Sequence, residues 1–172
     1  TKIEINRALV VPFVHDAQTL DEVASGDEEE YTKQFEVEGQ QRTIRITTMS
    51  TEEDTVLRDS YYRTARGWIL CYWSRMATTL VELEHRHGII LKVMDTDTAP
   101  TCLVALDEPN ERAVQLEEGR ALAKKLDIPF FVVDLTALTP FQLAAPFASV
   151  LMQMEVPSPP SPHKGQGKCN VS

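Results

Sequence analysis

Three short, predominantly apolar runs constrain the fold of this chain more than any other feature of the sequence. They are WILCYW at 68–73, TCLVAL at 101–106 and FFVVDL at 130–135. Strands that are apolar on both faces must be covered on both faces, as they are in parallel sheets. The segments between the runs are long enough to cross over such a sheet as helices. We therefore expect an α/β fold in three layers, with a mostly parallel sheet and helices on both faces.

The segments between and after the apolar runs carry helical signals. Residues 76–93 have apolar positions at helical spacing, and Ser74 is a candidate for their N-cap. Residues 111–126 also predict a helix, with two lysines in its last turn. Thr139 and Pro140 have the residue types of an N-cap and a first helical position, so they predict the start of a third helix.

A β-hairpin is predicted before the first apolar run. Residues 31–37 and 42–48 alternate apolar and polar side chains around the turn EGQ. The chain of 172 residues has no internal repeat and the size of one domain. After residue 156 the composition changes to PSPPSPHKGQGKCNVS, which is typical of a flexible, proline-rich tail. We expect a folded domain over residues 1–156 and a tail over residues 157–172.

Charge, cysteines and histidines narrow the classes of partner and ligand. The formal net charge is -9 at pH 7, which disfavours nucleic acid and favours a protein with a basic surface. Three cysteines without metal-ligand spacing indicate a reduced, cytoplasmic chain. His85 and His87 are two residues apart in a helical segment, so we expect them on different, exposed faces and predict no metal site.

Several segments resemble the Ras superfamily of small GTPases, and its Ras/Rap branch in particular. They are EEEYTKQFEVEG (28–39), LRDSYYRTARGWILCY (57–72), NERAVQLEEGRALAKKLDIPFF (110–131) and the terminal KCNVS. The resemblance extends over most of the chain. It implies a P-loop-type α/β fold and a signalling protein that binds GTP or GDP with Mg²⁺.

The motifs that bind phosphate and metal in that superfamily are replaced in this chain. Alignment with the family's first helix puts Asn6 and Arg7 at the Lys and Ser/Thr positions of the G-x-x-x-x-G-K-[ST] loop, and no glycine precedes Gly26. Either the first strand is missing or KIEINRALVV has taken its place. Thr51 and Glu52 stand where the resemblance implies the glycine and the water-orienting glutamine of switch II. The resemblance therefore predicts no catalytic residue and no metal ligand.

The site that would bind the base is less completely lost. LVALDEPNERAV (103–114) lies where the resemblance implies the N-K-x-D motif. In one alignment residues 106–109 replace that motif, and in another Asp107 is kept as the carboxylate that would accept the two N–H groups of guanine. Thr136 and Ala137 partly match the S-A-K motif. The other interpretation of Asp107 is an ordinary acidic turn residue before a helix.

Two further sites are implied by the resemblance. Glu28, Glu29 and Tyr31 match the acidic segment and edge strand with which the family docks effector domains by strand addition. The charge run can also be read as a solvated loop. Cys169 begins a C-a-a-X box whose terminal serine favours farnesylation. A single prenyl group without a polybasic patch predicts weak, reversible attachment to the cytoplasmic face of a membrane.

Two functions are open at this point. The first is a pseudoGTPase, a protein-interaction module in signalling that needs no cofactor. The second is a divergent but active GTPase that takes GTP or GDP with Mg²⁺. In the second case the phosphate loop is atypical or lies upstream of Thr1, and Asp107, Thr136 and Ala137 form the base site. A structural subunit of a larger complex is a third class.

Overall fold

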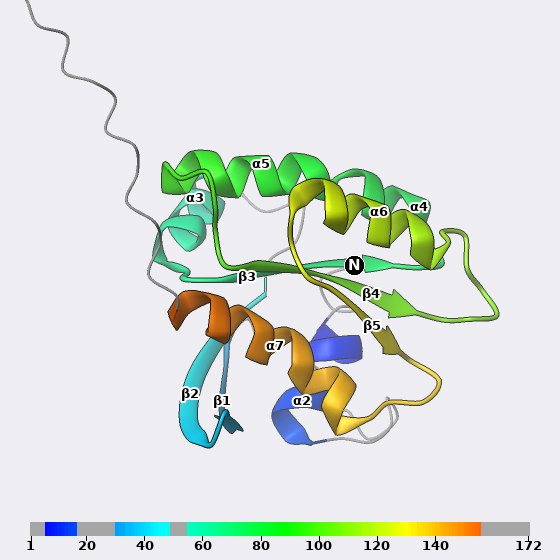
Figure 1. The fold of residues 1–172 in the computed structure, drawn as a ribbon, viewed down its shortest axis with the longest axis horizontal. Coiled ribbons are helices and arrows are strands. Elements are labelled where there is room, and N and C mark those ends of the chain that lie inside the picture. The colour runs from blue at the N-terminus through cyan, green and yellow to red at the C-terminus, as the bar shows by residue number, and fades with distance from the viewer. Residues whose placement is uncertain (1–5, 17–29, 49–54, 156–172) are drawn as a thin grey trace, which may run out of the picture.

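The centre of the molecule is a parallel sheet made by the three apolar runs. The structure is a computed structural model that describes residues 6–16, 30–48 and 55–155. Strands β3 (Trp68–Trp73), β4 (Thr101–Asp107) and β5 (Phe130–Asp134) pair in parallel in the order β3-β4-β5 (Figure 1). Because β4 has a neighbour on each side and helices above and below, it is buried along its whole length.

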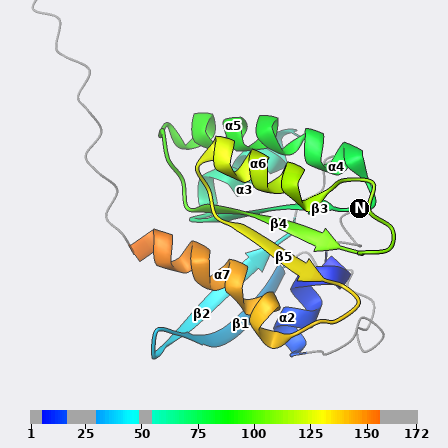
Figure 2. The same cartoon turned by 45° about the vertical axis from the view of Figure 1, so that its right-hand side comes forward.

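Helices cover both faces of this sheet, as the apolar runs predict. One face carries α3 (Thr55–Thr64), α4 (Ala77–Val81), α5 (Leu83–Met94) and α6 (Leu116–Leu126), and the other carries α2 (Val11–His15) and α7 (Pro140–Glu155) (Figures 1 and 2). Alternate residues of β3 divide between the two faces. Leu70 and Tyr72 pack in the cluster under α5 and α6, whereas Trp73 packs in the cluster with α2 and α7. The fold is therefore the mixed α/β architecture that the sequence predicts.

The predicted hairpin is formed by β1 (Glu30–Val37) and β2 (Gln40–Thr47). Its two-residue turn has φ values of 49° at Glu38 and 75° at Gly39. Positive φ at both turn residues matches the twist of the strands, and glycine adopts it at little cost. In both views the hairpin lies on the same side of the parallel sheet as α2 and α7 (Figures 1 and 2).

Phe13 of α2 packs between the hairpin and the rest of the core. Its ring stacks on that of Phe147 in α7, with centroids 4.1 Å apart, and meets Phe35 of β1 edge-on at 5.2 Å. Ile44 and Ile46 of β2 pack against the same cluster. Among the residues that the structure describes, no strand joins the hairpin to the parallel sheet.

The chain segment before α2 is helical. Asn6–Val10 form a π-helix that continues directly into α2. The interpretation in which KIEINRALVV replaces the family's first strand is therefore wrong from Asn6 onward. Strands β2 and β3 consequently line one cavity of about 1060 Å³, and no described strand lies between them.

The predicted helix over 76–93 is in fact two helices. The helix is interrupted at Glu82, between α4 and α5. Met76 rather than Ser74 occupies the N-cap position of α4. Ser74 is fully buried, and its hydroxyl accepts a hydrogen bond from the N–H of Glu108 at 3.0 Å. The cap prediction for Ser74 is therefore wrong, because a contact with the next strand's loop uses its side chain.

The predicted helix over 111–126 begins five residues later than expected. Gln115 and Glu118 form a capping box, so α6 starts at Leu116. The prediction for the next helix is confirmed, since α7 starts at Pro140 and the hydroxyl of Thr139 accepts a hydrogen bond from the N–H of Gln142. None of the helices in the described ranges is long and apolar enough to cross a membrane.

Candidate functional site

The carboxyl ends of β4 and β5 bring the predicted base-site residues to one edge of the sheet. Asp107 is paired in register with Asp134, and the N–H of Leu135 donates to the carbonyl of Asp107 at 2.9 Å. Both the N–H and the hydroxyl of Thr136 donate to Oδ1 of Asp134, at 2.8 and 2.6 Å. The N–H of Ala137 donates to the carbonyl of Asp134. Asp107, Thr136 and Ala137 therefore lie on adjacent strand ends, where the family resemblance places them.

The carboxylate of Asp107 is buried and already has its hydrogen-bond donors. Its residue is 2% exposed and is the last residue of β4, so the interpretation as a turn residue is wrong. Arg112 donates from Nε to Oδ1 at 2.7 Å and from Nη2 to Oδ2 at 2.5 Å. The hydrogen bond from Arg112 lowers the pKa of Asp107, burial raises it less, and a bond from Ser74 lowers it further. The side chain is thus an ionised acceptor with both oxygens occupied.

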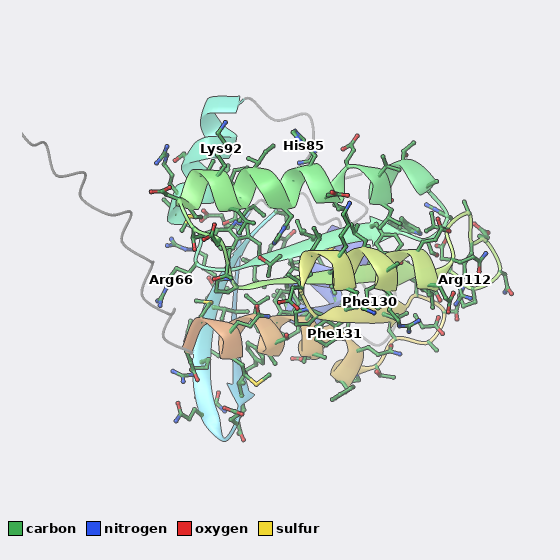
Figure 3. The ribbon with its side chains drawn as sticks, turned by 45° about the horizontal axis from the view of Figure 1, so that its top comes forward. Arg66, His85, Lys92, Arg112, Phe130 and Phe131 are labelled. Carbon is green, nitrogen blue, oxygen red and sulfur yellow. The ribbon has the colours of Figure 1, made fainter. Side chains whose placement is uncertain are left out.

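The two hydrogen bonds from Arg112 to Asp107 form a fork, here called the Arg112 fork. It has the hydrogen-bonding pattern that the edge of a guanine base would present. A guanidinium offers two parallel N–H groups to a carboxylate, which is the same bidentate arrangement that base recognition requires. The chain therefore places its own cation on the carboxylate expected to receive the base. Arg112 lies at one end of the sheet and Arg66 at the other (Figure 3). No family motif pointed to Arg112, because it follows Asp107 by five residues in an irregular loop.

The loop that carries Arg112 is held by the main chain of Ser74. The carbonyl of Ser74 accepts hydrogen bonds from the N–H groups of Ala113 and Val114, both at 2.8 Å, while its N–H donates to the carbonyl of Leu106. With the bond from Glu108 to the Ser74 hydroxyl, both ends of the loop are anchored on one buried residue. This anchoring holds Arg112 within reach of Asp107.

Only the end of the segment aligned with the phosphate loop, from Asn6 onward, lies within the described residues. A cradle needs a loop whose consecutive N–H groups point at the ligand. Asn6–Val10 are helical, and a helix also follows the loop in a P-loop, so the described backbone does not distinguish a cradle that is present from one that is missing. Ala8, Leu9 and Val10 are at most 4% exposed and belong to the core.

The other predicted site residues lie apart from Asp107 or outside the described ranges. Tyr31 is 6% exposed and packs against Val10 and Val11, so its ring is not a surface group. Glu28 and Glu29 lie outside the described residues, as does Cys169. Within the described ranges, no group of three or more His, Cys, Asp or Glu side chains is placed to hold a metal ion.

The two histidines differ in their surroundings. His85 is exposed on the outer side of α5, as predicted (Figure 3). The prediction for His87 is wrong, because this residue is 7% exposed and faces the sheet. Burial lowers the pKa of His87.

Cys71 and Cys102 are core thiols, and burial raises the pKa of Cys71 to about 12.

The fold combines a parallel sheet covered by helices on both faces, loop residues at the carboxyl edge of that sheet, and an antiparallel hairpin. This combination defines the class of Ras-like P-loop domains. Comparison with protein families agrees with this class. The model of the Ras family matches residues 6–156, and the chain belongs to that family. The chain is therefore a member of the Ras-like small GTPase superfamily.

Proposed function

We propose that this Ras-family protein is a pseudoGTPase, a signalling protein that works through protein contacts and has impaired or absent GTP binding and hydrolysis. The observation that carries the proposal is the Arg112 fork on Asp107. A guanine base can reach that carboxylate only if it displaces two charge-assisted hydrogen bonds. At about 1.5 to 3 kcal/mol for a charge-assisted hydrogen bond, this competition weakens base binding roughly 10- to 150-fold.

The phosphate side of the site supports the same function. In P-loop GTPases the phosphate loop and its Mg²⁺ ion hold the phosphates of the nucleotide. In the alignment, Asn6 and Arg7 stand at the positions of the Lys and Ser/Thr ligands, so the ammonium group and the hydroxyl that would bind phosphate and Mg²⁺ are replaced. Weak base binding and the replacement of these two ligands act together, because each removes contacts to a different part of the nucleotide.

One observation favours the second candidate, a divergent but active GTPase that binds GTP or GDP with Mg²⁺. Asp107, Thr136 and Ala137 share one edge of the sheet, and Asp107 is ionised. If Arg112 swings away, the carboxylate is free for a base. An atypical phosphate loop would then complete the site.

Nucleotide content and binding separate the two candidates. The purified full chain is denatured, the supernatant is run on an anion-exchange column, and binding of fluorescent GDP and GTP is titrated with and without Mg²⁺. We expect no bound nucleotide and no measurable binding. Stoichiometric guanine nucleotide would establish the active GTPase instead. Arg112→Met tests the fork, and Arg120→Met, which removes an exposed arginine of α6, is the matched control.

Partner binding and membrane attachment complete the proposal. The outer edge of β1 has no neighbour among the described strands, which supports docking of an effector with a basic surface beside Glu28 and Glu29; the ring of Tyr31 is buried and is not part of that surface. Charge reversal of Glu28 and Glu29 is expected to abolish that binding. A prenyl group on Cys169 would give weak attachment to the cytoplasmic face of a membrane. A C-terminal mass equal to that of the unmodified sequence would exclude the prenyl group.

A further inference from the structure

Helix α7 lies on the outside of the molecule but has no polar outer face. Charged residues make up 25% of the chain, yet none lies between Asp134 and Glu155, so the only charge of α7 is at its last residue. A helix that covers a sheet from the outside normally turns charged and polar side chains toward solvent. In neither view does a described element lie in front of α7 (Figures 1 and 2). The helix is therefore apolar on the side that the described part of the chain leaves open.

The outer side chains of α7 form a short apolar stripe. Leu143, Phe147 and Val150 are buried in the core against the sheet. The positions on the opposite side of the helix follow one another at helical spacing. They form the α7 stripe, which consists of Phe141, Ala145, Ala148 and Met152. Its two ends are large and exposed, at 81% for Phe141 and 40% for Met152, whereas the two central alanines are half-buried.

The order of side chains in the α7 stripe is the same in both directions: large, small, small, large. A surface that binds a second copy of itself across a two-fold axis must be complementary to itself. If two α7 helices pack antiparallel about the midpoint of the stripe, Phe141 of each copy meets the partner's Met152, and Ala145 meets the partner's Ala148. We propose that the α7 stripe is the interface of a dimer of this chain with that geometry. The proposal does not depend on whether the protein binds nucleotide.

Both kinds of contact suit closely packed helices. Alanine at the centre lets the two helix axes approach to about 8 Å, the short end of the usual range. A thioether beside an aromatic ring is a favourable contact, so Phe141 and Met152 fill the space at the two ends. Both of these side chains leave water on association, which stabilises the dimer by hydrophobic burial.

The charge distribution favours this face over the rest of the surface. Two copies with a formal net charge of -9 each repel one another, and the repulsion is weakest where the contact itself carries no charge. In the antiparallel arrangement, Glu155 at the end of one helix lies near the start of the other helix at Pro140. The N-terminal end of a helix carries a partial positive charge, so this end contact is attractive.

A lipid surface and the chain's own tail fit the α7 stripe less well than a second copy. A helix that binds a membrane surface usually has Lys and Arg along its polar face, and α7 has neither. The tail sequence PSPPSPHKGQGKCNVS is rich in proline, serine and glycine and offers few large apolar side chains. A second copy supplies a ring and a thioether at the spacing that the stripe requires.

The α7 stripe is too small for a permanent dimer. The 16 residues of α7 extend over about 24 Å. One helix face of this length buries less than the roughly 800 Å² per partner of a standard interface. We therefore expect reversible association with a Kd on the order of 100 µM.

Sedimentation equilibrium of the unprenylated full chain over a range of concentrations measures this association. Phe141→Lys is expected to weaken the dimer at least about tenfold, because a charged group would enter an apolar contact. Val81→Lys is the matched control, since Val81 of α4 is also a large apolar residue, is 78% exposed and lies outside the α7 stripe. The control should leave the Kd within about twofold. Circular dichroism checks that both variants fold.

A charge swap tests the antiparallel arrangement. Met152→Glu alone should also weaken the dimer, because it places a charge beside the partner's Phe141. When the Phe141→Lys and Met152→Glu proteins are mixed, the two introduced charges meet as an ion pair, and the second contact between Phe141 and Met152 stays intact. The mixture is expected to form heterodimers about tenfold more tightly than either variant forms homodimers.

Five results would overturn the proposal. The first three are a protein that stays monomeric up to about ten times the expected Kd, a dimer that Phe141→Lys leaves intact, and a mixture that does not recover. The fourth is flotation of the unprenylated protein with neutral phosphatidylcholine vesicles that Phe141→Lys abolishes, which would mean that lipid covers the stripe. The fifth is NMR contacts between the Phe141 ring and residues 157–172 in the monomer, which would mean that the tail covers it. Nucleotide content is measured separately, so this proposal and that of a pseudoGTPase fail separately.

Discussion

The Asp107 carboxylate links the stability of the fold to the function, because its two oxygens accept hydrogen bonds either from Arg112 or from a guanine base. Its charge is stabilised by Arg112 and Ser74 in a nearly water-free position. We expect Asp107→Asn to lower the free energy of unfolding by about 2 kcal/mol, because an amide turns one N–H toward the donors of Arg112 and carries no charge. Urea unfolding at pH 7 measures this loss. Asp97→Asn, at an exposed loop position, is the control.

The pH dependence of stability gives a second test of the same carboxylate. The folded pKa of Asp107 lies below the 3.8 of a free aspartate. A depressed pKa means that the unfolded chain binds the proton first, so this contribution is present above about pH 4 and is lost as the pH falls through the folded pKa. In Asp107→Asn the decline in stability below pH 4 should be shallower. An unchanged decline would mean that the carboxylate is not held by Arg112.

His87 is a second residue whose burial sets a pH dependence. Burial lowers its folded pKa below 6.5, so acid protonates the unfolded chain first. Stability is therefore expected to fall as the pH drops below about 6.5 and to level off below the folded pKa. Urea midpoints at pH 7.5 and 5.5 measure the change. His87→Leu should flatten it and the exposed His85→Leu should not. Equal behaviour of the two variants would contradict the assigned burial.

At the scale of elements, the seating of α6 on the sheet depends on a glycine. A Cβ at Gly119 would overlap the hydroxyl and ring of Tyr72, whereas a Cβ at Gly88 in α5 would meet nothing within 4 Å. We expect Gly119→Ala to destabilise the protein by about 2 kcal/mol through overpacking. Gly88→Ala is the matched control and should stabilise it by up to about 1 kcal/mol, because alanine favours a helix. Thermal unfolding of the two variants measures both effects.

A double variant tests the cause of that loss. The hydroxyl of Tyr72 has no hydrogen-bond partner in the described residues, so Tyr72→Phe alone is expected to cost little. In the Gly119→Ala background the same change should restore part of the lost stability, since it removes the overlapping oxygen. No recovery would mean that α6 shifts as a whole rather than pressing on that atom.

The strands and the start of α7 could be predicted almost to the residue, whereas the start of α6 could not. Continuous apolar runs are sufficient for β3, β4 and β5, because burial on both faces leaves no polar position inside a strand. The start of α6 depends instead on tertiary contacts. Ala113 and Val114 donate to the carbonyl of Ser74, and this contact between distant segments keeps them out of the helix. The capping box that does begin α6 was present in the sequence at Gln115 and Glu118.

The candidate site, too, could be predicted from the sequence only in part. The positions of Asp107, Thr136 and Ala137 at one sheet edge follow from the order of the strands, which the sequence contains. The pairing of Asp107 with Arg112 does not, because it depends on the path of an irregular loop. The burial of His87 likewise depends on how α5 is rotated against the sheet, which its weakly amphipathic sequence does not fix.

At the scale of the whole molecule, the described strands form two sheets rather than one. The hairpin and the parallel sheet share a core on the side of α2 and α7, and Phe13 lies between Phe35 and Phe147. No described strand bonds across the cavity, so among the described residues it is side-chain packing that joins the two sheets there. Regions held by few contacts open locally at lower free energy than the core.

Phe13→Ala is therefore expected to loosen the hairpin more than the parallel sheet. The substitution should cost about 3 kcal/mol, and amides of β1 and β2 should exchange faster by a larger factor than those of β4 in native-state hydrogen exchange. Ile90→Ala, on the opposite face at 1% exposure, is the control that should weaken β4 at least as much as the hairpin. If both variants accelerate exchange equally in the two sheets, then the sheets unfold as one cooperative unit and side-chain packing across the cavity is as effective as a strand.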